Sequence, residues 1–406
     1  MRTILFYEIK KIIGRKITWV TFIILFVLQG MTAFSSNWGK DTVNEITVET
    51  HAQRNATDRK NGLALSGRKI DDTLLTEMQQ AYKEFTKNTP ITDNGEYLLS
   101  EEYQENVRPY SELYQSLSWW LSYSTLEPME VTAEELMDFR KEEVQTNWDF
   151  WKLSEKERNY WQKEEEKLPD VFSYQYATAY EDLINMHGEY IVSLLLTFFI
   201  AICMVGVFEE EAHCRTDQLV LCTPLGRSKL YFAKILAGSI VVFAATAAFA
   251  ILSMLGSFIC FGTEGFTAML QIGADFTSSL NLTVGQVFLI MLAILFLSCI
   301  LIGIIAMLLA RLLHNSIGAM AVILGLLFAA RLITIPNSLR ILSKLWNLLP
   351  INLLKIDQGF LDIRLFSIGS ISLTTWQFAP ILYILLGGII VLAGKKMYCN
   401  SEIGGR

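Results

Sequence analysis

The stretch that decides the fold is VGQVFLIMLAILFLSCILIGIIAMLLA, residues 284–310, which contains no charged side chain. A helix needs roughly 20 mostly apolar residues to cross the hydrocarbon core of a bilayer. A second uncharged stretch covers residues 235–263. Runs of this length exceed the usual helices of a soluble core, so we expect membrane-spanning helices rather than buried ones.

The whole chain fits this interpretation. Of its 406 residues, 52% are hydrophobic and only 18% are charged, and its mean hydropathy is +0.33. The hydrophobic fraction is higher and the charged fraction is lower than in ordinary soluble domains, as is typical of membrane proteins. Arg331 lies near one end of the fifth apolar run, where its side chain can reach the lipid headgroups. The predicted spans are residues 17–34, 190–208, 235–261, 284–310, 316–335 and 379–394.

Lysine and arginine in the short connections predict the orientation, because basic residues favour the cytoplasmic side. They precede the first span, follow the last one and occupy the connection between spans two and three. Both termini are therefore expected in the cytoplasm. Residues 336–377 should be external, yet they carry Arg340, Lys344, Lys355 and Arg364, which fits the rule poorly.

The N-terminal sequence MRTILFYEIKKIIGRK predicts an amphipathic helix over residues 1–16 that lies in the membrane surface. Ile4, Leu5, Ile9, Ile12 and Ile13 recur at helical spacing, and basic residues occupy the other side. A cleaved signal peptide is the alternative. We favour an uncleaved anchor, because the apolar run at 17–34 is longer than a signal peptide usually has.

Residues 35–189 form a polar segment between the first two spans, and we expect a mainly helical extracytoplasmic domain. Acidic residues outnumber basic ones there about two to one. TAEE at 132–135 and SEKE at 154–157 have the spacing of capping boxes, which predicts two helix starts. The segment has no cysteine, so disulfides cannot stabilise it. Its aromatic residues could form a binding platform, but we favour a core. The candidates for that core are Trp119, Trp120, Trp148, Trp151, Trp161 and the tyrosines of 174–180.

Catalytic and metal-binding patterns are scarce. The chain contains no G-x-x-x-x-G-K-[ST] loop and no H-E-x-x-H helix, so we expect neither nucleotide hydrolysis nor a zinc site on this chain. His213 next to Glu209, Glu210 and Glu211 could be imagined as a metal site. Consecutive glutamates on a helix point in different directions, so a solvated helix end is the preferred interpretation. Energy for any transport would have to come from elsewhere.

Residues 209–234, which we call the elbow, form a compact polar segment between spans two and three. Pro224 disfavours helix at Thr223, Gly226 permits a tight turn, and Ser228 can start the next helix. A helix, a corner and a second helix would then project into the cytoplasm. From these residues alone, an ordinary connecting loop is an equally good interpretation.

The elbow resembles a segment of the ABC type-2 permease family. The matching residues are Phe-Glu-Glu-Glu at 208–211, Arg215-Thr216, LCTPLGR at 221–227 and Ala233-Lys234. The family pattern there is an acidic residue, a basic one beside a small one, Leu-x-Ser/Thr-Pro, an arginine and a lysine. NLLPIN at 347–352 is similar to the family's segment before its last span. Cys222 stands where serine is more usual, and the segment at 35–189 is larger than in simple members.

The resemblance implies a permease subunit of an ATP-driven exporter in the cytoplasmic membrane. Two permease chains, as a homodimer or heterodimer, would pair among membrane lipids, and each would bind a separate P-loop ATPase subunit that carries ATP and Mg²⁺. No nucleic acid is expected as a partner, and the chain is not expected to be an enzyme or to hold a cofactor. The residues implied in ATPase contact are Glu211, Arg215, Gln218, Thr223, Pro224 and Arg227.

The predicted organisation is a cytoplasmic interface helix at 1–16, a first span at 17–34, an extracytoplasmic domain at 35–189, a membrane domain with five spans at 190–397 and a cytoplasmic tail at 398–406. The alternative function is a membrane sensor or scaffold whose external domain binds a ligand and signals to a cytoplasmic partner. An integral membrane enzyme is a third possibility, for which the sequence offers no catalytic constellation. The sequence does not identify the cargo.

Overall fold

A computed structural model describes residues 2–89, 96–122, 124–184, 189–213, 228–353, 359–369 and 371–400. The chain divides into two compact units. We call residues 1–31, 188–253 and 290–406 the membrane unit, and residues 32–187 and 254–289 the polar unit.

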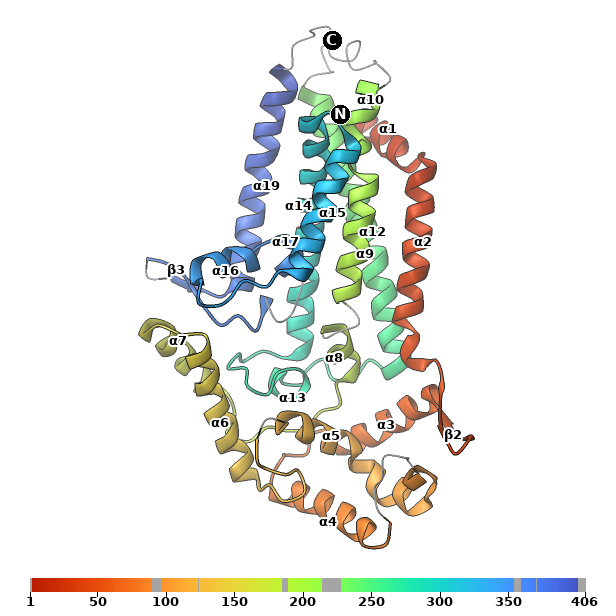
Figure 1. The fold of residues 1–406 in the computed structure, drawn as a ribbon, viewed down its shortest axis with the longest axis vertical. Helices are drawn as coiled ribbons and strands as arrows, with labels where there is room; N and C mark the ends of the chain where they lie inside the picture. Colours follow the sequence, from red (N-terminus) through yellow and green to blue (C-terminus); the bar gives the residue numbers. More distant parts are fainter. Residues whose placement is uncertain are drawn as a thin grey trace. The chain divides into compact units, whose positions relative to one another are not determined.

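The membrane unit consists of long apolar helices that pack around a core of aliphatic and aromatic side chains (Figure 1). It begins with α1 (Arg2–Ile13) and α2 (Lys16–Ala33). Next come α9 (Glu189–Cys203), α10 (Gly206–His213), α12 (Ser228–Phe261) and α14 (Val284–Leu313). The last elements are α15 (Ser316–Leu332), α16 (Arg340–Asn347), α17 (Pro350–Leu353), the antiparallel pair β3 (Phe366–Ile368) and β4 (Ile371–Leu373), and α19 (Thr375–Asn400).

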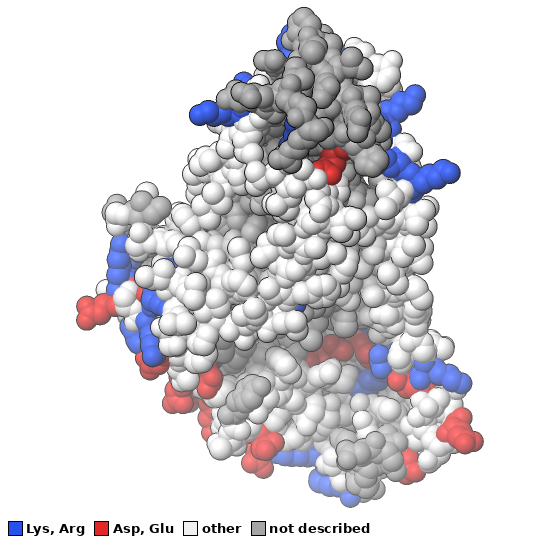
Figure 2. Space-filling view, turned by 45° about the horizontal axis from the view of Figure 1, so that its top comes forward, with Lys and Arg blue, Asp and Glu red and all other residues white. Residues whose placement is uncertain are grey.

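Among the described residues, five helical segments are long and apolar enough to cross a membrane. They are α2, the segment Ile191–Glu209 that covers most of α9 and the start of α10, α12, α14 and α19. The fifth predicted span corresponds to α15, an apolar helix of 17 residues that is shorter than the other five. In Figure 2 the exposed surface of the membrane unit is a wide, almost entirely white belt, and Lys and Arg gather at one end of it. A belt without charges is what contact with lipid requires.

The N-terminal amphipathic helix is present as α1. Ile12 is buried in the core of the membrane unit, and Leu5 and Ile9 pack against the same core. The predicted corner at residues 223–227 lies outside the described residues, and α12 is described from Ser228. Helix α12 continues without a break to Phe261, since nothing in its sequence interrupts the apolar run.

The polar unit is mainly helical. Its N-terminal part has η1 (Ser35–Asn37), the hairpin β1 (Lys40–Val43) and β2 (Ile46–Thr50), α3 (His51–Leu65) and α4 (Asp72–Asn88). Short turns η2 (Glu96–Leu99), η3 (Tyr103–Val107) and η4 (Arg108–Tyr110) lead to α5 (Ser111–Trp120). Helices α6 (Ala133–Phe150), α7 (Glu155–Glu165), α8 (Thr178–Ile184) and α13 (Leu270–Gly273) complete it.

Both predicted capping boxes are confirmed. Thr132 accepts a bond from the backbone N–H of Glu135, and the Glu135 carboxylate accepts one from the N–H of Thr132, at the start of α6. At the start of α7 the N–H of Ser154 donates to Glu157 at 2.9 Å. These reciprocal bonds satisfy amides that the first helical turn leaves unpaired.

The aromatic core is confirmed for most of its predicted members. Trp161, Tyr174, Tyr176 and Tyr180 are buried, and Trp120 packs against the core cluster of the polar unit. The prediction is wrong for Trp119, whose side chain is 75% exposed. Neighbouring positions on a helix face different directions, so Trp119 and Trp120 cannot both face one core.

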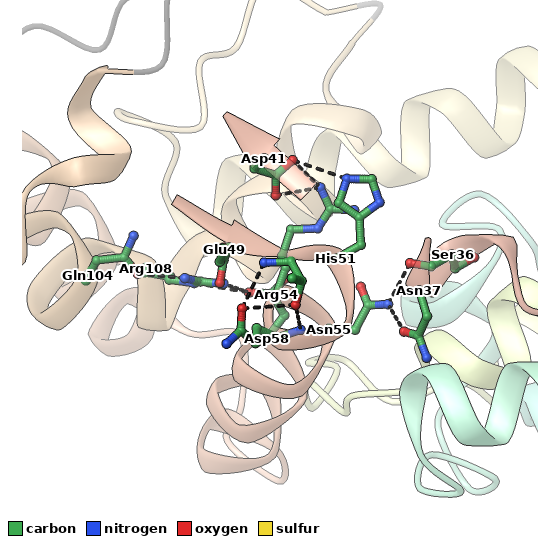
Figure 3. A network of polar contacts seen from close by, with 12 residues as sticks. Ser36, Asn37, Asp41, Glu49, His51, Arg54, Asn55, Asp58, Gln104 and Arg108 are labelled. Atoms are coloured by element: carbon green, nitrogen blue, oxygen red, sulfur yellow. Dashed lines mark hydrogen bonds and ion pairs between the residues drawn. The ribbon is translucent and has the colours of Figure 1, made fainter. Parts of the chain in front are cut away.

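A network of ion pairs and hydrogen bonds connects the hairpin to the following helices (Figure 3). Arg108 is almost buried and contacts Glu49 of β2 at 2.9 Å and Asp58 of α3 at 3.2 Å. Asp41 of β1 pairs with Arg54 of α3 at 3.2 Å. Two strands alone have little stability. The ion pairs of Asp41 with Arg54 and of Glu49 with Arg108 therefore help to hold the short hairpin in place.

Residues 254–289, expected largely as the end of a span and a loop, belong to the polar unit. Arg140 of α6 is buried and donates to the carbonyls of Phe276 and Ser278, both at 2.9 Å, and to the carboxylate of Glu165. A Cβ placed on Gly256 would lie 2.4 Å from the carbonyl oxygen of Ala33. Gly256 therefore permits close packing within the chain.

Candidate functional site

Lys234, at the end of the elbow, is completely buried in the membrane unit. Its exposed fraction is 0%, and its ammonium group contacts the Glu8 carboxylate at 3.1 Å. The same group donates to the carbonyl of Val207 at 3.1 Å and lies 5.7 Å from the centre of the Phe208 ring. A buried charge is stable only when it is paired and hydrogen-bonded, and Lys234 meets both conditions.

Glu8 supplies the other half of this ion pair from α1. It is 7% exposed, although the neighbouring Phe6 and Tyr7 are exposed. The sequence analysis did not identify Glu8. Its signal was nevertheless available: Glu8 lies at helical spacing from Leu5 and Ile12, so it is an acidic residue on the apolar face of a basic helix.

Arg15 connects the junction of α1 and α2 to the junction of α9 and α10. Its guanidinium donates to the carbonyl of Gly206 at 3.0 Å and to the carbonyl of Cys203 at 3.4 Å. Cys203 is the last residue of α9, where carbonyls lack partners within the helix and a cation is favoured. A Cβ at position 206 would lie 3.0 Å from the guanidinium, so glycine leaves room for this contact.

Glu209 connects α10 to the start of α15. Its carboxylate accepts bonds from the backbone N–H of Ser316 at 3.1 Å and from the Ser316 hydroxyl at 3.0 Å. Asn315 caps the same helix start by accepting from the N–H groups of Ile317 and Gly318. The prediction that the glutamates form a solvated helix end is therefore wrong for Glu209, because the unpaired amides of a helix start attract a carboxylate.

An aromatic cluster connects the same region to the last helix. Phe208, Tyr231 and Tyr398 lie with ring centres 5.5 to 5.8 Å apart. The Tyr231 hydroxyl donates to the carbonyl of Val391 at 2.7 Å. Arg311 of α14 lies 5.8 Å from the centre of the Tyr398 ring. The start of the elbow is thus attached to α15 through Glu209. Its end is attached to α1 through Lys234 and to α19 through Tyr231.

The predicted contact residues lie largely outside the described residues. This holds for Arg215, Gln218, Thr223, Pro224 and Arg227. Glu211 lies within α10, but its side chain is also outside the description. The structure therefore describes how the elbow begins and ends within the membrane unit.

The described contacts of this site join helices to one another. Its contacts are ion pairs, helix-end contacts and aromatic packing, and the described residues include no group of three His, Cys, Asp or Glu side chains that could hold a metal ion. Separating these helices would leave buried polar groups without their hydrogen-bond partners, which costs free energy.

The long apolar helices and the belt on the surface define a multi-pass membrane protein. The family model described as ABC-2 family transporter protein matches residues 2–358. The chain belongs to this family, which confirms the resemblance noted in its sequence. Proteins of the family are the membrane components of transport systems and generally work with a separate ATPase subunit. A search of curated proteins and a search of solved structures each found no match.

Proposed function

We propose that this chain is the permease subunit of an ATP-driven exporter, and that the elbow receives the movement of the ATPase subunit. The observation that carries the proposal is the attachment of both elbow ends: Lys234 pairs with Glu8, and Glu209 caps α15 through Ser316. A force on the elbow would reach α1, α12 and α15 together. Rigid-body movement of several helices is a common form of conformational switching.

In this proposal the ATPase contacts Glu211, Arg215, Gln218, Thr223, Pro224 and Arg227 from the cytoplasm. ATP and Mg²⁺ bind the ATPase subunit, and two permease chains pair in the cytoplasmic membrane. Helix α15 serves as a sixth, short span, so both termini lie in the cytoplasm. The polar unit is extracytoplasmic, which agrees with its acidic composition and lack of cysteine between residues 35 and 189.

The test is the double charge reversal Arg215→Glu/Arg227→Glu in a preparation that contains the chain and its ATPase. We expect the complex to weaken, or ATP hydrolysis to lose its dependence on transport. Lys396→Glu is the control, because Lys396 is an exposed base near the end of α19, outside the elbow. Unchanged assembly, hydrolysis and transport in the double variant would overturn the proposal and favour a sensor or scaffold.

A further inference from the structure

A cleft in the polar unit lies between α6, α7 and the segment that follows α7, and we call it the α6–α7 cleft. Its volume is about 490 Å³, within the roughly 300–1,000 Å³ of pockets that hold small molecules. All of its lining residues belong to the polar unit, so binding there does not depend on the role of the elbow. One face of α6 lines the cleft with side chains at helical spacing: Met137, Arg140, Lys141, Val144, Gln145 and Trp148.

The buried residues that line the cleft form its floor, and the charges of this floor neutralise each other. Arg140, Val144 and Phe172 are almost completely buried. The Arg140 guanidinium lies 5.3 Å from the centre of the Phe172 ring and donates to the Glu165 carboxylate and to two backbone carbonyls. A buried guanidinium needs such partners. Arg140 therefore holds the floor together and has little bonding capacity left for a ligand.

Two ion pairs connect the helices that form the walls of the cleft. Arg140 of α6 pairs with Glu165 of α7, and Asp149 of α6 pairs with Arg158 of α7. The first pair lies at the floor, and the second lies near the connection between the two helices. A pocket whose walls are fixed before binding loses less conformational freedom when a ligand enters.

The rim of the cleft is acidic. Glu166 and Asp170 line it and are exposed, and within the described parts of the chain neither carboxylate has an ion-pair partner. Lys141, the exposed base of the lining, pairs with Asp138 at 3.0 Å. An anion would therefore meet two carboxylates and, among the described lining residues, no unpaired base. A cation would be attracted instead.

Apolar side chains supply the surface between the floor and this rim. Leu168 and Trp148 line the cleft and are half-buried, so part of each side chain stays accessible. The face of an indole ring attracts cations and packs well against apolar groups. We propose that the α6–α7 cleft binds a small amphipathic organic cation, whose apolar body packs against Trp148 and Leu168 and whose ammonium group contacts Glu166 and Asp170. Apolar walls with a few polar groups that fix the orientation are typical of small-molecule sites.

The test measures binding of dansylcadaverine, a fluorescent primary amine with an aromatic body, to the full-length chain in phosphatidylcholine nanodiscs. Fluorescence anisotropy is the readout, and the signal from empty nanodiscs is subtracted. Two related probes keep the aromatic body and change the charge: acetylated dansylcadaverine is neutral, and dansyl-aminohexanoate is an anion. The variants are Glu166→Gln/Asp170→Asn and Trp148→Ala. The control is Glu142→Gln/Glu155→Gln, which removes two exposed carboxylates of α6 and α7 outside the cleft.

We expect saturable binding of dansylcadaverine that is unchanged in the control. Glu166→Gln/Asp170→Asn should weaken it about fivefold to tenfold, as the loss of two ion pairs near the surface predicts. Trp148→Ala should weaken it about tenfold. The neutral probe should bind the unaltered chain about as weakly as dansylcadaverine binds the double variant.

Absence of saturable binding, or equal binding of the three probes, would overturn the proposal. Undiminished binding of dansylcadaverine to Glu166→Gln/Asp170→Asn would overturn it as well. Both of these substitutions are at exposed positions, so the double variant should fold normally, and its melting temperature verifies this. The outcome therefore does not depend on the stability of Trp148→Ala.

Discussion

The Lys234 ammonium lies 3.1 Å from the Glu8 carboxylate, and both side chains are buried in the membrane unit. The two residues are 226 positions apart in the sequence, and their pair joins the N-terminal helix to the end of the elbow. Removing one partner of a buried pair leaves an unpaired charge, whereas replacing both partners with apolar residues costs much less.

We therefore predict that Lys234→Met alone destabilises the protein by about 3–5 kcal/mol, and that Glu8→Leu/Lys234→Met is less destabilised than the single variant. Thermal unfolding in detergent measures both effects. The control is Lys229→Met on the same helix, because Lys229 is exposed and should change stability little. Additive effects of Glu8→Leu and Lys234→Met would contradict the coupling of these residues.

A second prediction concerns the polar unit, where Arg140 joins α6 to residues 276 and 278. Arg140→Met should destabilise this unit by about 3–5 kcal/mol, because Glu165 and two buried carbonyls lose their partner. The adjacent Lys141 pairs with Asp138 on the surface, so Lys141→Met should cost about 1 kcal/mol or less. Protease resistance of the polar unit measures the difference, and equal losses in both variants would rule out the role assigned to Arg140.

The pH dependence of the polar unit follows from buried carboxyl groups. Burial raises the pKa of Glu112 to about 7 and that of Glu181 to about 8, with further contributions from Asp58 and Glu112 respectively. The folded state therefore keeps protons that the unfolded state releases above about pH 4.5. Stability falls as the pH rises from about 5 to 8, since the charged forms are poorly solvated.

We accordingly expect the melting temperature of the polar unit to be higher by about 5 °C at pH 5.5 than at pH 8.5. Glu181→Gln should flatten this dependence, and Glu84→Gln, at an exposed position of α4, should leave it unchanged. Glu77 and Glu264 have lowered pKa values beside Arg68 and Arg59, so their contribution is lost only at more acidic pH. A melting temperature that rises between pH 5.5 and 8.5 would refute this account.

The proposed orientation predicts which residues a membrane-impermeant maleimide reaches in intact cells. A cysteine introduced at Glu142, on an exposed part of α6, should react fully. A cysteine at Lys10, exposed on α1, should react only after the membrane is permeabilised. Both variants are made without the native cysteines, and the reverse labelling pattern would invert the proposed topology.

The sequence predicts those parts of the structure that depend on neighbouring residues. The capping boxes at Thr132 and Ser154 and the amphipathic α1 follow from local patterns, and the structure agrees with them. Helix and capping signals repeat within a few residues, so one sequence is enough to detect them.

The pairings that hold the candidate site together were not predicted. Glu8 and Lys234 are far apart in the chain, and no local pattern announces that they meet. The exposure of Ile341 and Leu345 on α16 was missed for a related reason. Helical periodicity separates an apolar side from a polar one, but it does not say which side faces the protein when lipid is the solvent.

The most direct test of the central claim, that the elbow binds an ATPase subunit, is photo-crosslinking in living cells. A photoreactive amino acid replaces Arg215 or Thr223, with Glu142 as the control position, and the adducts are identified by mass spectrometry. We predict that positions 215 and 223 capture a protein with a P-loop and that position 142 does not. Absence of any P-loop ATPase from the adducts at 215 and 223, in cells that retain transport, would contradict the account.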